Sequence, residues 1–279
     1  MNTQFLIPCS TLNNLKPEDL HEAFSRLGAF RLKHAIDPRL IKQLRTSAEQ
    51  VLHLPLLAKA PYFRSETSAG YTPPGIEGVK GKGPDFHRHF WDVLSPDRAL
   101  NRMPPQCVAF QTAAYTVYRA AENAAYQVFA LMDQVLGPLA TTKRRLLPAA
   151  AGGQHMLRIS EYLMGEQETR GDILFPAHKD FGLLTAYIGG AEPGLQMEID
   201  GDWLDVYNEA GSMILACGTT LNKIIGSPLY RPVTHRVVAK SKQRLSAVLF
   251  TEPRPEIPLA DGETSGAYLL RKAKEVRHE

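Results

Sequence analysis

The feature that most constrains the fold is a change in residue pattern at about residue 154. Beyond it, short apolar runs rich in β-branched and aromatic residues alternate with turns made of Gly, Pro and Asp. Several short strands at this spacing are typical of a β-sandwich or jelly roll. The runs predicted as strands cover residues 183–188, 203–206, 213–216, 235–238 and 245–250.

The first half of the chain favours helices instead. Apolar residues recur at helical spacing over 20–27 and 40–51, and an alanine-rich helix is predicted over 107–137. Residues 64–86 are rich in Gly and Pro and are predicted to form a long loop, while the tail, 266–278, is predicted as a charged helix. We expect one compact unit made of a helix-rich N-terminal region (1–106), a helical connection (107–153), a β core (154–255) and a C-terminal helix (256–279).

Composition excludes several classes of function. A net charge of +3 over 279 residues, with no block of like charges, argues against nucleic-acid binding. No apolar stretch is long enough to span a bilayer, and the N-terminus lacks the pattern of a signal peptide. Cys9, Cys107 and Cys217 form no close pair, which favours a reducing compartment. We expect a cytoplasmic protein that binds a small molecule, with no nucleic acid or membrane partner; the oligomeric state stays open.

The most informative tripeptide is His178-Lys179-Asp180. On an extended strand, His178 and Asp180 point to the same face and Lys179 to the other. Two histidines and one carboxylate on one face of a metal, with open positions, are typical of non-haem Fe(II) oxygenases. Alone, the tripeptide is better explained by a surface ion pair. A second histidine, His235, follows 57 positions later in a strand-like run and completes a candidate set of three ligands.

A candidate anion-binding pair follows the third ligand. Arg244 and Ser246 lie in another strand-like run and share a face by alternation. The planar guanidinium of arginine matches a carboxylate in a bidentate way, and serine adds a hydroxyl donor. The sequence therefore supplies a metal centre and a carboxylate clamp on neighbouring strands.

At these residues the chain resembles a known family. Residues 154–255 are similar to the isopenicillin N synthase-like branch of the Fe(II)/2-oxoglutarate-dependent dioxygenases. The matching motifs are His178-x-Asp180 with Gly182, Leu184 and Thr185; Gly194-Leu195-Gln196; Trp203 with Asp205 and Val206; His235-Arg236-Val237; and Arg244-x-Ser246. The N-terminal segments IPCSTL, LGAFRLKHAI and AGYTPPGIEG also resemble the family, so the resemblance covers nearly the whole chain.

The resemblance implies an α+β fold with a double-stranded β-helix (jelly-roll) core and flanking helices. It implies an oxidoreductase that uses Fe(II), 2-oxoglutarate and O2 to oxidise, most often to hydroxylate, a C–H bond of a small molecule. Natural-product or antibiotic biosynthesis is the expected setting. By resemblance, Arg244 and Ser246 bind the far carboxylate of 2-oxoglutarate, with Tyr162 as a third donor, and no further catalytic residue is implied.

The chain departs from the family pattern at two places. Ser160-Glu161-Tyr162 stands where many members have Asn-x-Tyr, and Gly218-Thr219 stands where Gly-Asp is common. Two other functions remain open: a 2-oxoglutarate-independent iron oxidase, in which the same clamp grips a different carboxylate, and a non-catalytic binding protein. The second would be expected to lack a metal ligand, and all three are present.

Three other histidines are weaker candidates. His87 and His89, in Asp85-Phe86-His87-Arg88-His89, could belong to a second metal site, but no partner motif follows. We expect a loop past the mouth of the active site there, with one histidine near the substrate. His155 could line the pocket or have a structural role. Residues 62–94 and the C-terminal helix are expected to determine the substrate.

Overall fold

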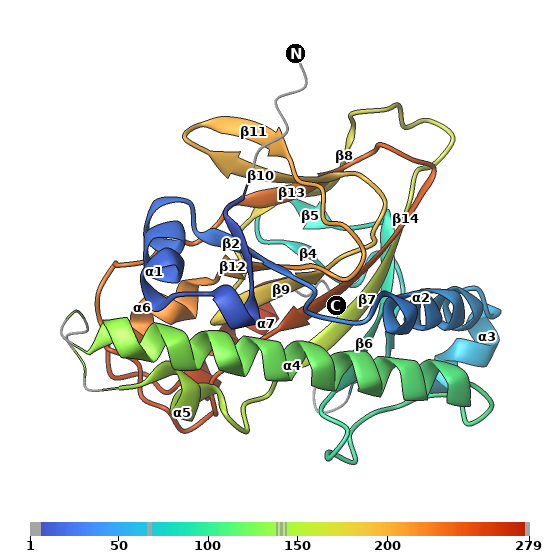
Figure 1. The fold of residues 1–279 in the computed structure, drawn as a ribbon. Coiled ribbons are helices and arrows are strands. Elements are labelled where there is room, and N and C mark those ends of the chain that lie inside the picture. The colour runs from blue at the N-terminus through green and yellow to red at the C-terminus, as the bar shows by residue number, and fades with distance from the viewer. Residues whose placement is uncertain (1–6, 66–68, 138, 140–141, 143, 277–279) are drawn as a thin grey trace.

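The strands of the second half of the chain form two facing sheets (Figure 1). The structure is a computed structural model and describes all residues except 1–6, 66–68, 138, 140–141, 143 and 277–279. The larger sheet contains β7 (Met156–Leu163), β9 (Leu184–Ile188), β12 (Met213–Cys217) and β14 (Gln243–Phe250). The smaller sheet consists of β8 (Ile173–His178), β10 (Leu195–Ile199), β11 (Asp202–Asp205) and β13 (His235–Val238). This alternation of antiparallel strands is the predicted jelly roll within an α+β fold.

The first half of the chain adds strands to both edges of the larger sheet. At one edge lie β1 (Cys9–Thr11) and β2 (Ala29–Lys33), and at the other β6 (Arg88–Leu94) and β3 (Tyr71–Thr72). The full order is β1-β2-β12-β9-β14-β7-β6-β3. The stretch predicted as a loop over 64–86 also contains a short hairpin of β4 (Gly78–Val79) and β5 (Gly83–Pro84). The prediction missed these pairings because Gly and Pro dominate the segment.

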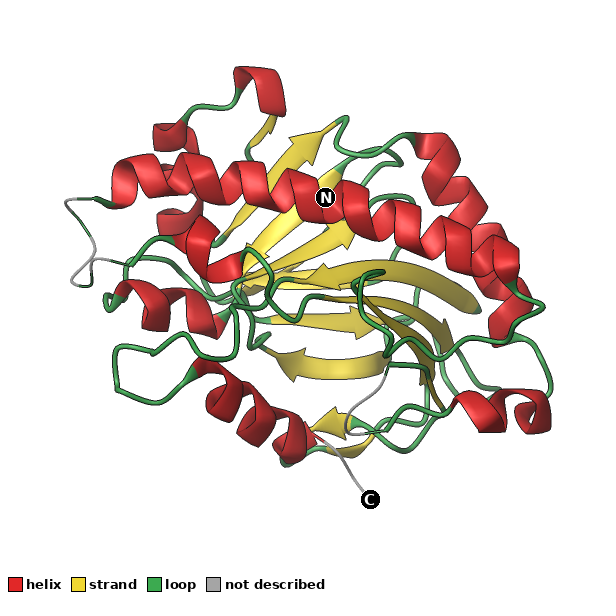
Figure 2. Ribbon diagram, turned by 90° about the horizontal axis from the view of Figure 1, so that it is seen from below, coloured by secondary structure: helices red, strands yellow, loops and turns green. Residues whose placement is uncertain are grey.

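Helix α4 (Val108–Leu136) runs across the outer face of the larger sheet (Figures 1 and 2). Small buried residues such as Ala114, Ala121 and Ala125 let its backbone approach the sheet and its helical neighbours closely. The remaining helices are α1 (Pro17–Arg26), α2 (Pro38–Leu52), α3 (Leu56–Lys59), α5 (Leu146–Ala150), α6 (Thr219–Ile225) and α7 (Ser265–Val276), with 3-10 turns at Leu12–Asn14 and Ala60–Tyr62. The helices predicted over 107–137 and 266–278 are confirmed, apart from 277–278, which lie outside the described residues.

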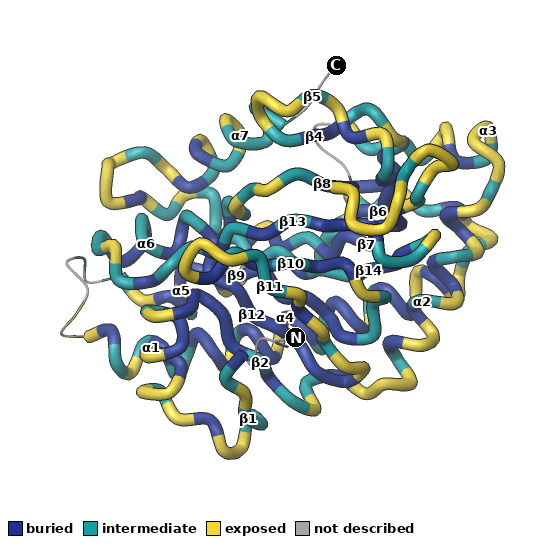
Figure 3. Tube along the Cα trace, turned by 90° about the horizontal axis from the view of Figure 1, so that it is seen from above, coloured by how far each residue is buried: buried dark blue, intermediate teal, exposed yellow. Residues whose placement is uncertain are grey.

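Most of the apolar core lies between the larger sheet and the helices outside it. Its largest fully buried side chains include Trp91, Tyr118, Phe24 and Phe129. In Figure 3 the buried segments gather in the strands and in α4. Because this outer core supplies much of the burial that stabilises a fold, the inner face of the sheet can carry polar and charged side chains.

Among the described residues, no helix combines the length and the apolar character needed to cross a bilayer. The three cysteines are free thiols.

Candidate active site

Three potential metal ligands meet between the two sheets. The pairing of β8 with β13 places His178 directly opposite His235, and Asp180 follows β8 by two residues. His178 Nε2 lies 3.6 Å from Asp180 Oδ1, and His235 Nε2 lies 3.6 Å from Asp180 Oδ2. This is the only group of three metal-binding side chains found in the described part of the chain. The prediction that Asp180 lies on a strand was wrong, since β8 ends at His178, but both side chains do face the same point.

The hydrogen bonds of the two histidines orient them as ligands. His178 Nδ1 lies 2.8 Å from the carbonyl oxygen of Pro176, and His235 Nδ1 lies 3.3 Å from that of Val233. A carbonyl only accepts, so each Nδ1 donates, and each Nε2 faces Asp180. At 3.6 Å these Nε2 atoms are too far from the carboxylate for a hydrogen bond. Both distances suit ligands of one ion, since atoms about 2.1 Å from a common ion lie within about 4.2 Å of each other.

Hydroxyl groups hold the carboxylate of Asp180 from behind. Thr185 Oγ1 and Tyr187 Oη donate to Asp180 Oδ2 over 2.7 and 3.2 Å. Burial alone would raise the pKa of Asp180, but His235, His178 and these two hydroxyls lower it overall. Burial lowers the pKa of His178. The lowered pKa values of Asp180 and His178 favour an ionised carboxylate and a neutral His178 ring, the protonation states in which these groups bind metals.

The predicted anion clamp lies on the same inner face. Arg244 and Ser246 are on β14, and their partners across β7 are Tyr162 and Ser160. Arg244 is 6% exposed, and its Nε donates to the carbonyl oxygen of Glu192 over 3.1 Å. That bond fixes the guanidinium plane, whose carbon lies 5.4 Å from the centre of the Tyr162 ring. A side chain on Gly194 would collide with the carbonyl oxygen of Val238 at 2.6 Å, which explains the glycine of the Gly-Leu-Gln motif.

One pocket joins the metal cluster to the clamp. It is lined by Arg88, Arg158, Ser160, Tyr162, Phe175, His178, Asp180, Tyr187, Leu195, His235, Val237, Arg244, Ser246, Val248 and Phe250. All six predicted site residues are therefore brought together. Arg88 is a pocket residue that the sequence interpretation missed.

The segment around His87 and His89 is not the predicted loop. Residues 88–94 form β6, a buried strand paired with β7. Because neighbouring residues face opposite sides of a sheet, Arg88 faces the pocket and His89 faces away. His89 Nε2 lies 2.5 Å from Glu161 Oε2, and His87 Nε2 lies 3.8 Å from Glu168 Oε1. Neither histidine lines the pocket. The apolar run Phe90-Trp91, followed by Val93-Leu94, is the sequence signal that could have indicated a strand.

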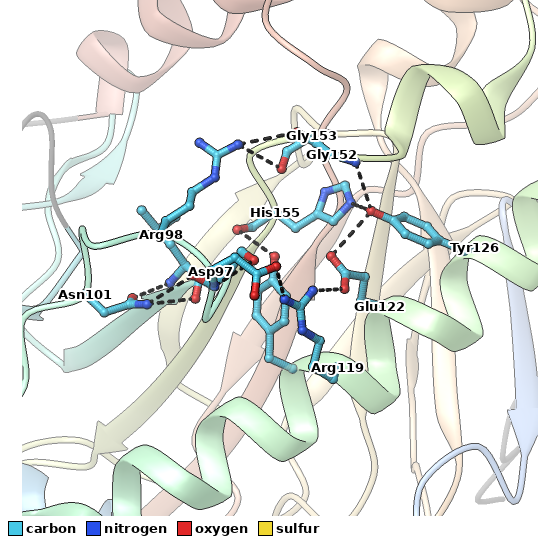
Figure 4. Close-up of polar contacts among 12 residues, drawn as sticks. Asp97, Arg98, Asn101, Arg119, Glu122, Tyr126, Gly152, Gly153 and His155 are labelled. Atoms are coloured by element: carbon cyan, nitrogen blue, oxygen red, sulfur yellow. Dashed lines mark hydrogen bonds and ion pairs between the residues drawn. The ribbon is translucent and has the colours of Figure 1, made fainter.

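His155 belongs to a polar network at the far side of the sheet, beside α4 (Figure 4). Its Nε2 lies 2.9 Å from Tyr126 Oη, and its Nδ1 accepts the backbone N–H of Glu252 over 2.9 Å. Tyr126 Oη also donates to Glu122 Oε1 over 3.4 Å, and Glu122 Oε2 accepts from Arg119 Nη1 over 2.6 Å. Of the two roles considered, the structural one is correct, because His155 is outside the pocket.

Gly218-Thr219, which stands where Gly-Asp is common in the family, links the C-terminal helix to the site. The backbone N–H of Thr219 donates to the carbonyl oxygen of Asp180 over 3.0 Å, and its hydroxyl lies 3.0 Å from Tyr268 Oη on α7. Close approach of Gly218 to Gly182 leaves no room for a side chain, since an added Cβ would lie 2.2 Å from the Gly182 carbonyl oxygen. Threonine thus keeps the tight turn behind Asp180 and adds an anchor for α7.

Comparison with known proteins agrees with this geometry. Residues 153–253 match the family model of the 2OG-Fe(II) oxygenase superfamily, and residues 14–106 match that of the non-haem dioxygenase in morphine synthesis N-terminal region. Probable flavonol synthase 5 of Arabidopsis thaliana is 26% identical over 85% of this chain and 72% of its own length. Flavonol synthase/flavanone 3-hydroxylase of the same plant is 28% identical over 90% of this chain and 76% of its own length.

A solved structure shows the same fold. A full-length Neurospora crassa protein, crystallised in complex with alpha-KG, superposes with a TM-score of 0.81 at 18% identity, covering 98% of each chain. The two family models together span most of this chain. The chain therefore belongs to the Fe(II)/2-oxoglutarate-dependent oxygenase superfamily, fits its isopenicillin N synthase-like branch, and is a dioxygenase that uses Fe(II), 2-oxoglutarate and O2 to oxidise a small molecule.

Proposed function

We propose that His178, Asp180 and His235 bind the Fe(II) ion and that Arg244, Ser246 and Tyr162 bind the far carboxylate of 2-oxoglutarate. The observation that carries this proposal is the convergence of two imidazole Nε2 atoms and one carboxylate in the pocket that Arg244 also lines. Such a donor set leaves ion positions open for other ligands.

The reaction we propose is hydroxylation of a C–H bond. The bound ion, with 2-oxoglutarate and O2, supplies the oxidising power, and the balance is substrate, 2-oxoglutarate and O2 to alcohol, succinate and CO2. The residues of this chain hold and orient the reactants. Arg244 fixes the cosubstrate, while Phe175, Val248 and Phe250 exclude water from the reacting region.

We propose a small natural product as the substrate. The relatives are named for small organic compounds such as flavonols, and one structure of the Neurospora protein holds thymine. The pocket supports this class, since side chains from both sheets enclose it. We also propose that the protein acts in the cytoplasm; its three free thiols are typical of a reducing compartment.

The test is whether O2 uptake requires the cosubstrate. Iron-loaded protein is supplied with candidate substrates, with and without 2-oxoglutarate, and O2 consumption and succinate are measured together. We expect both to depend on 2-oxoglutarate and to rise when a substrate is present. Substrate-dependent O2 uptake that ignores 2-oxoglutarate would favour the oxidase alternative.

A further inference from the structure

A second arginine, Arg88, faces the proposed iron site from the edge of the pocket. The pairing of three strands places Arg88 on β6, Tyr162 on β7 and Arg244 on β14 in one row across the sheet. Residues directly opposite one another on neighbouring strands face the same side, so all three side chains project into the pocket. With strands about 4.8 Å apart, the two arginine backbones lie about 10 Å from each other.

The side chain of Arg88 is 93% buried, yet it has few partners. Its Nε lies 3.0 Å from Asp85 Oδ2, but both atoms lack an aligned hydrogen bond. Its terminal nitrogens donate no hydrogen bond to any residue in the described ranges. Burial raises the pKa of Asp85 although the charge of Arg88 lowers it, and no second ion pair of Arg88 is found among the described residues.

Another arginine that lines the pocket, Arg158, is paired with two carboxylates. Its Nε and Nη2 donate to the two carboxylate oxygens of Asp92 over 2.8 and 2.9 Å, and its Nη1 donates to Glu77 over 2.8 Å. Arg64 reaches the same two carboxylates and balances their charge. The fold therefore gives one buried guanidinium four hydrogen bonds to two carboxylates, whereas its neighbour Arg88 has only the ion pair with Asp85.

Aromatic rings hold the guanidinium of Arg88 beside the metal cluster. Its central carbon lies 3.9 Å from the centre of the Phe175 ring and 5.0 Å from that of Phe90. The Phe175 ring in turn packs edge-on against His178, with 4.7 Å between ring centres. Contacts with aromatic faces fix a guanidinium and compensate part of its lost hydration, but they leave its N–H donors available. A buried cation of this kind is stabilised by an anion that completes its hydrogen bonds.

We propose that Arg88 binds a carboxylate of the substrate, so that the enzyme oxidises a small organic acid with an apolar body. This inference rests on the proposed function and adds the substrate class to it. Arg244 and Arg88 then bind different carboxylates: Arg244 binds that of 2-oxoglutarate, and Arg88 binds that of the substrate. Phe175, Leu195 and Val237 provide the apolar surface for the body of the substrate.

The experiment compares acids with their uncharged analogues. The probes are phenylacetate, 3-phenylpropionate, hexanoate and indole-3-acetate, each paired with its primary amide. Protein loaded with Fe(II) and 2-oxoglutarate without O2 is titrated with each probe, and binding is followed by calorimetry and by the charge-transfer absorbance. We expect acids to bind at least about tenfold more tightly than their amides, the effect of one charge-assisted hydrogen bond.

Four variants assign that preference to a residue. Arg88→Met should remove it while 2-oxoglutarate affinity stays as in wild type, and Arg88→Lys should keep part of it. Asp85→Asn should preserve or strengthen acid binding, because it removes the competing carboxyl. Arg236→Met is the matched control, since Arg236 stacks on Trp203 outside the pocket. Circular dichroism checks the fold of each variant.

Three results would overturn the inference: no acid of the panel binds, amides bind as tightly as acids, or Arg88→Met weakens 2-oxoglutarate binding instead. The last would make Arg88 a cosubstrate residue. Failure of the proposed function has a different signature, which is the absence of 2-oxoglutarate binding in the wild type itself.

Discussion

The pocket and the network around His155 contain the same kinds of side chains. In the network the polar atoms bond to one another, whereas in the pocket several of them face a common point. In the network, both ring nitrogens of His155 are bonded, to Tyr126 and to a backbone N–H (Figure 4). In the pocket, only the Nδ1 atoms of His178 and His235 have protein acceptors, and the Nε2 atoms converge with Asp180. A buried polar cluster is thus a candidate binding site where its atoms face a common point, and structural where they satisfy one another.

The largest expected effect is at the metal cluster. Replacing His178, Asp180 or His235 with Ala should abolish turnover and weaken Fe(II) binding, because each change removes one of the three proposed ligands. Turnover and bound iron are measured after anaerobic loading. His89→Ala is the control, since His89 pairs with Glu161 on the opposite face of the sheet and should retain iron. Full activity in any of the three ligand variants would contradict the assignment.

Next in size is the clamp. Arg244→Ala should lower the affinity for 2-oxoglutarate by about tenfold to over a hundredfold, because it removes at least one charge-assisted hydrogen bond. Iron binding should survive, and Arg244→Lys should recover only part of the loss, since an ammonium lacks the planar fork. The readout is an anaerobic 2-oxoglutarate titration, with Arg236→Ala as control. Unchanged affinity in Arg244→Ala would show that another residue holds the carboxylate.

In the network around His155, a change of pH should alter the free energy of unfolding and leave the affinity for 2-oxoglutarate unchanged. Burial, with a contribution from the charge of Arg98, lowers the pKa of His155 to about 4. Below its usual pKa of about 6.5 the unfolded chain binds a proton that the folded chain does not, so stability falls as pH drops from about 6.5 to about 4. The loss from this group is about 3 kcal/mol at most.

Denaturant unfolding of wild type and His155→Gln over that pH range isolates the effect. Glutamine does not titrate and can still accept the Glu252 N–H. The variant should lose less stability than wild type as pH falls. If the free energy of unfolding depended on pH in the same way in both proteins, His155 would not be held neutral in the folded state.

The smallest expected effect is at Tyr126. Tyr126→Phe removes the hydroxyl that bonds to His155 and should cost about 1 kcal/mol of unfolding free energy. Affinity for 2-oxoglutarate should not change, because Tyr126 lies outside the pocket. A large fall in cosubstrate affinity without loss of stability would mean that the two regions are coupled, against the distinction drawn above.

Residues of the pocket differ in how far the sequence predicts them. His178, Asp180, His235 and Arg244 stand in ordered motifs, and strand alternation gives the facing of Arg244 and Ser246 directly. The role of Arg88 depends on the pairing of β6 with β7, more than sixty positions along the chain, which no local pattern shows. The sequence indicated the two histidines that flank Arg88 as candidates, but it is Arg88 that lines the pocket.

The most direct test of the central assignment is diffraction from crystals grown without O2 in the presence of Mn(II), as a stand-in for Fe(II), and 2-oxoglutarate. Anomalous scattering locates the ion. The account predicts one strong peak bonded to His178 Nε2, His235 Nε2 and Asp180, with the far carboxylate of 2-oxoglutarate on Arg244 and Ser246. A peak elsewhere, such as beside Glu161 and His89, or a cosubstrate carboxylate on Arg88 in place of Arg244, would contradict it.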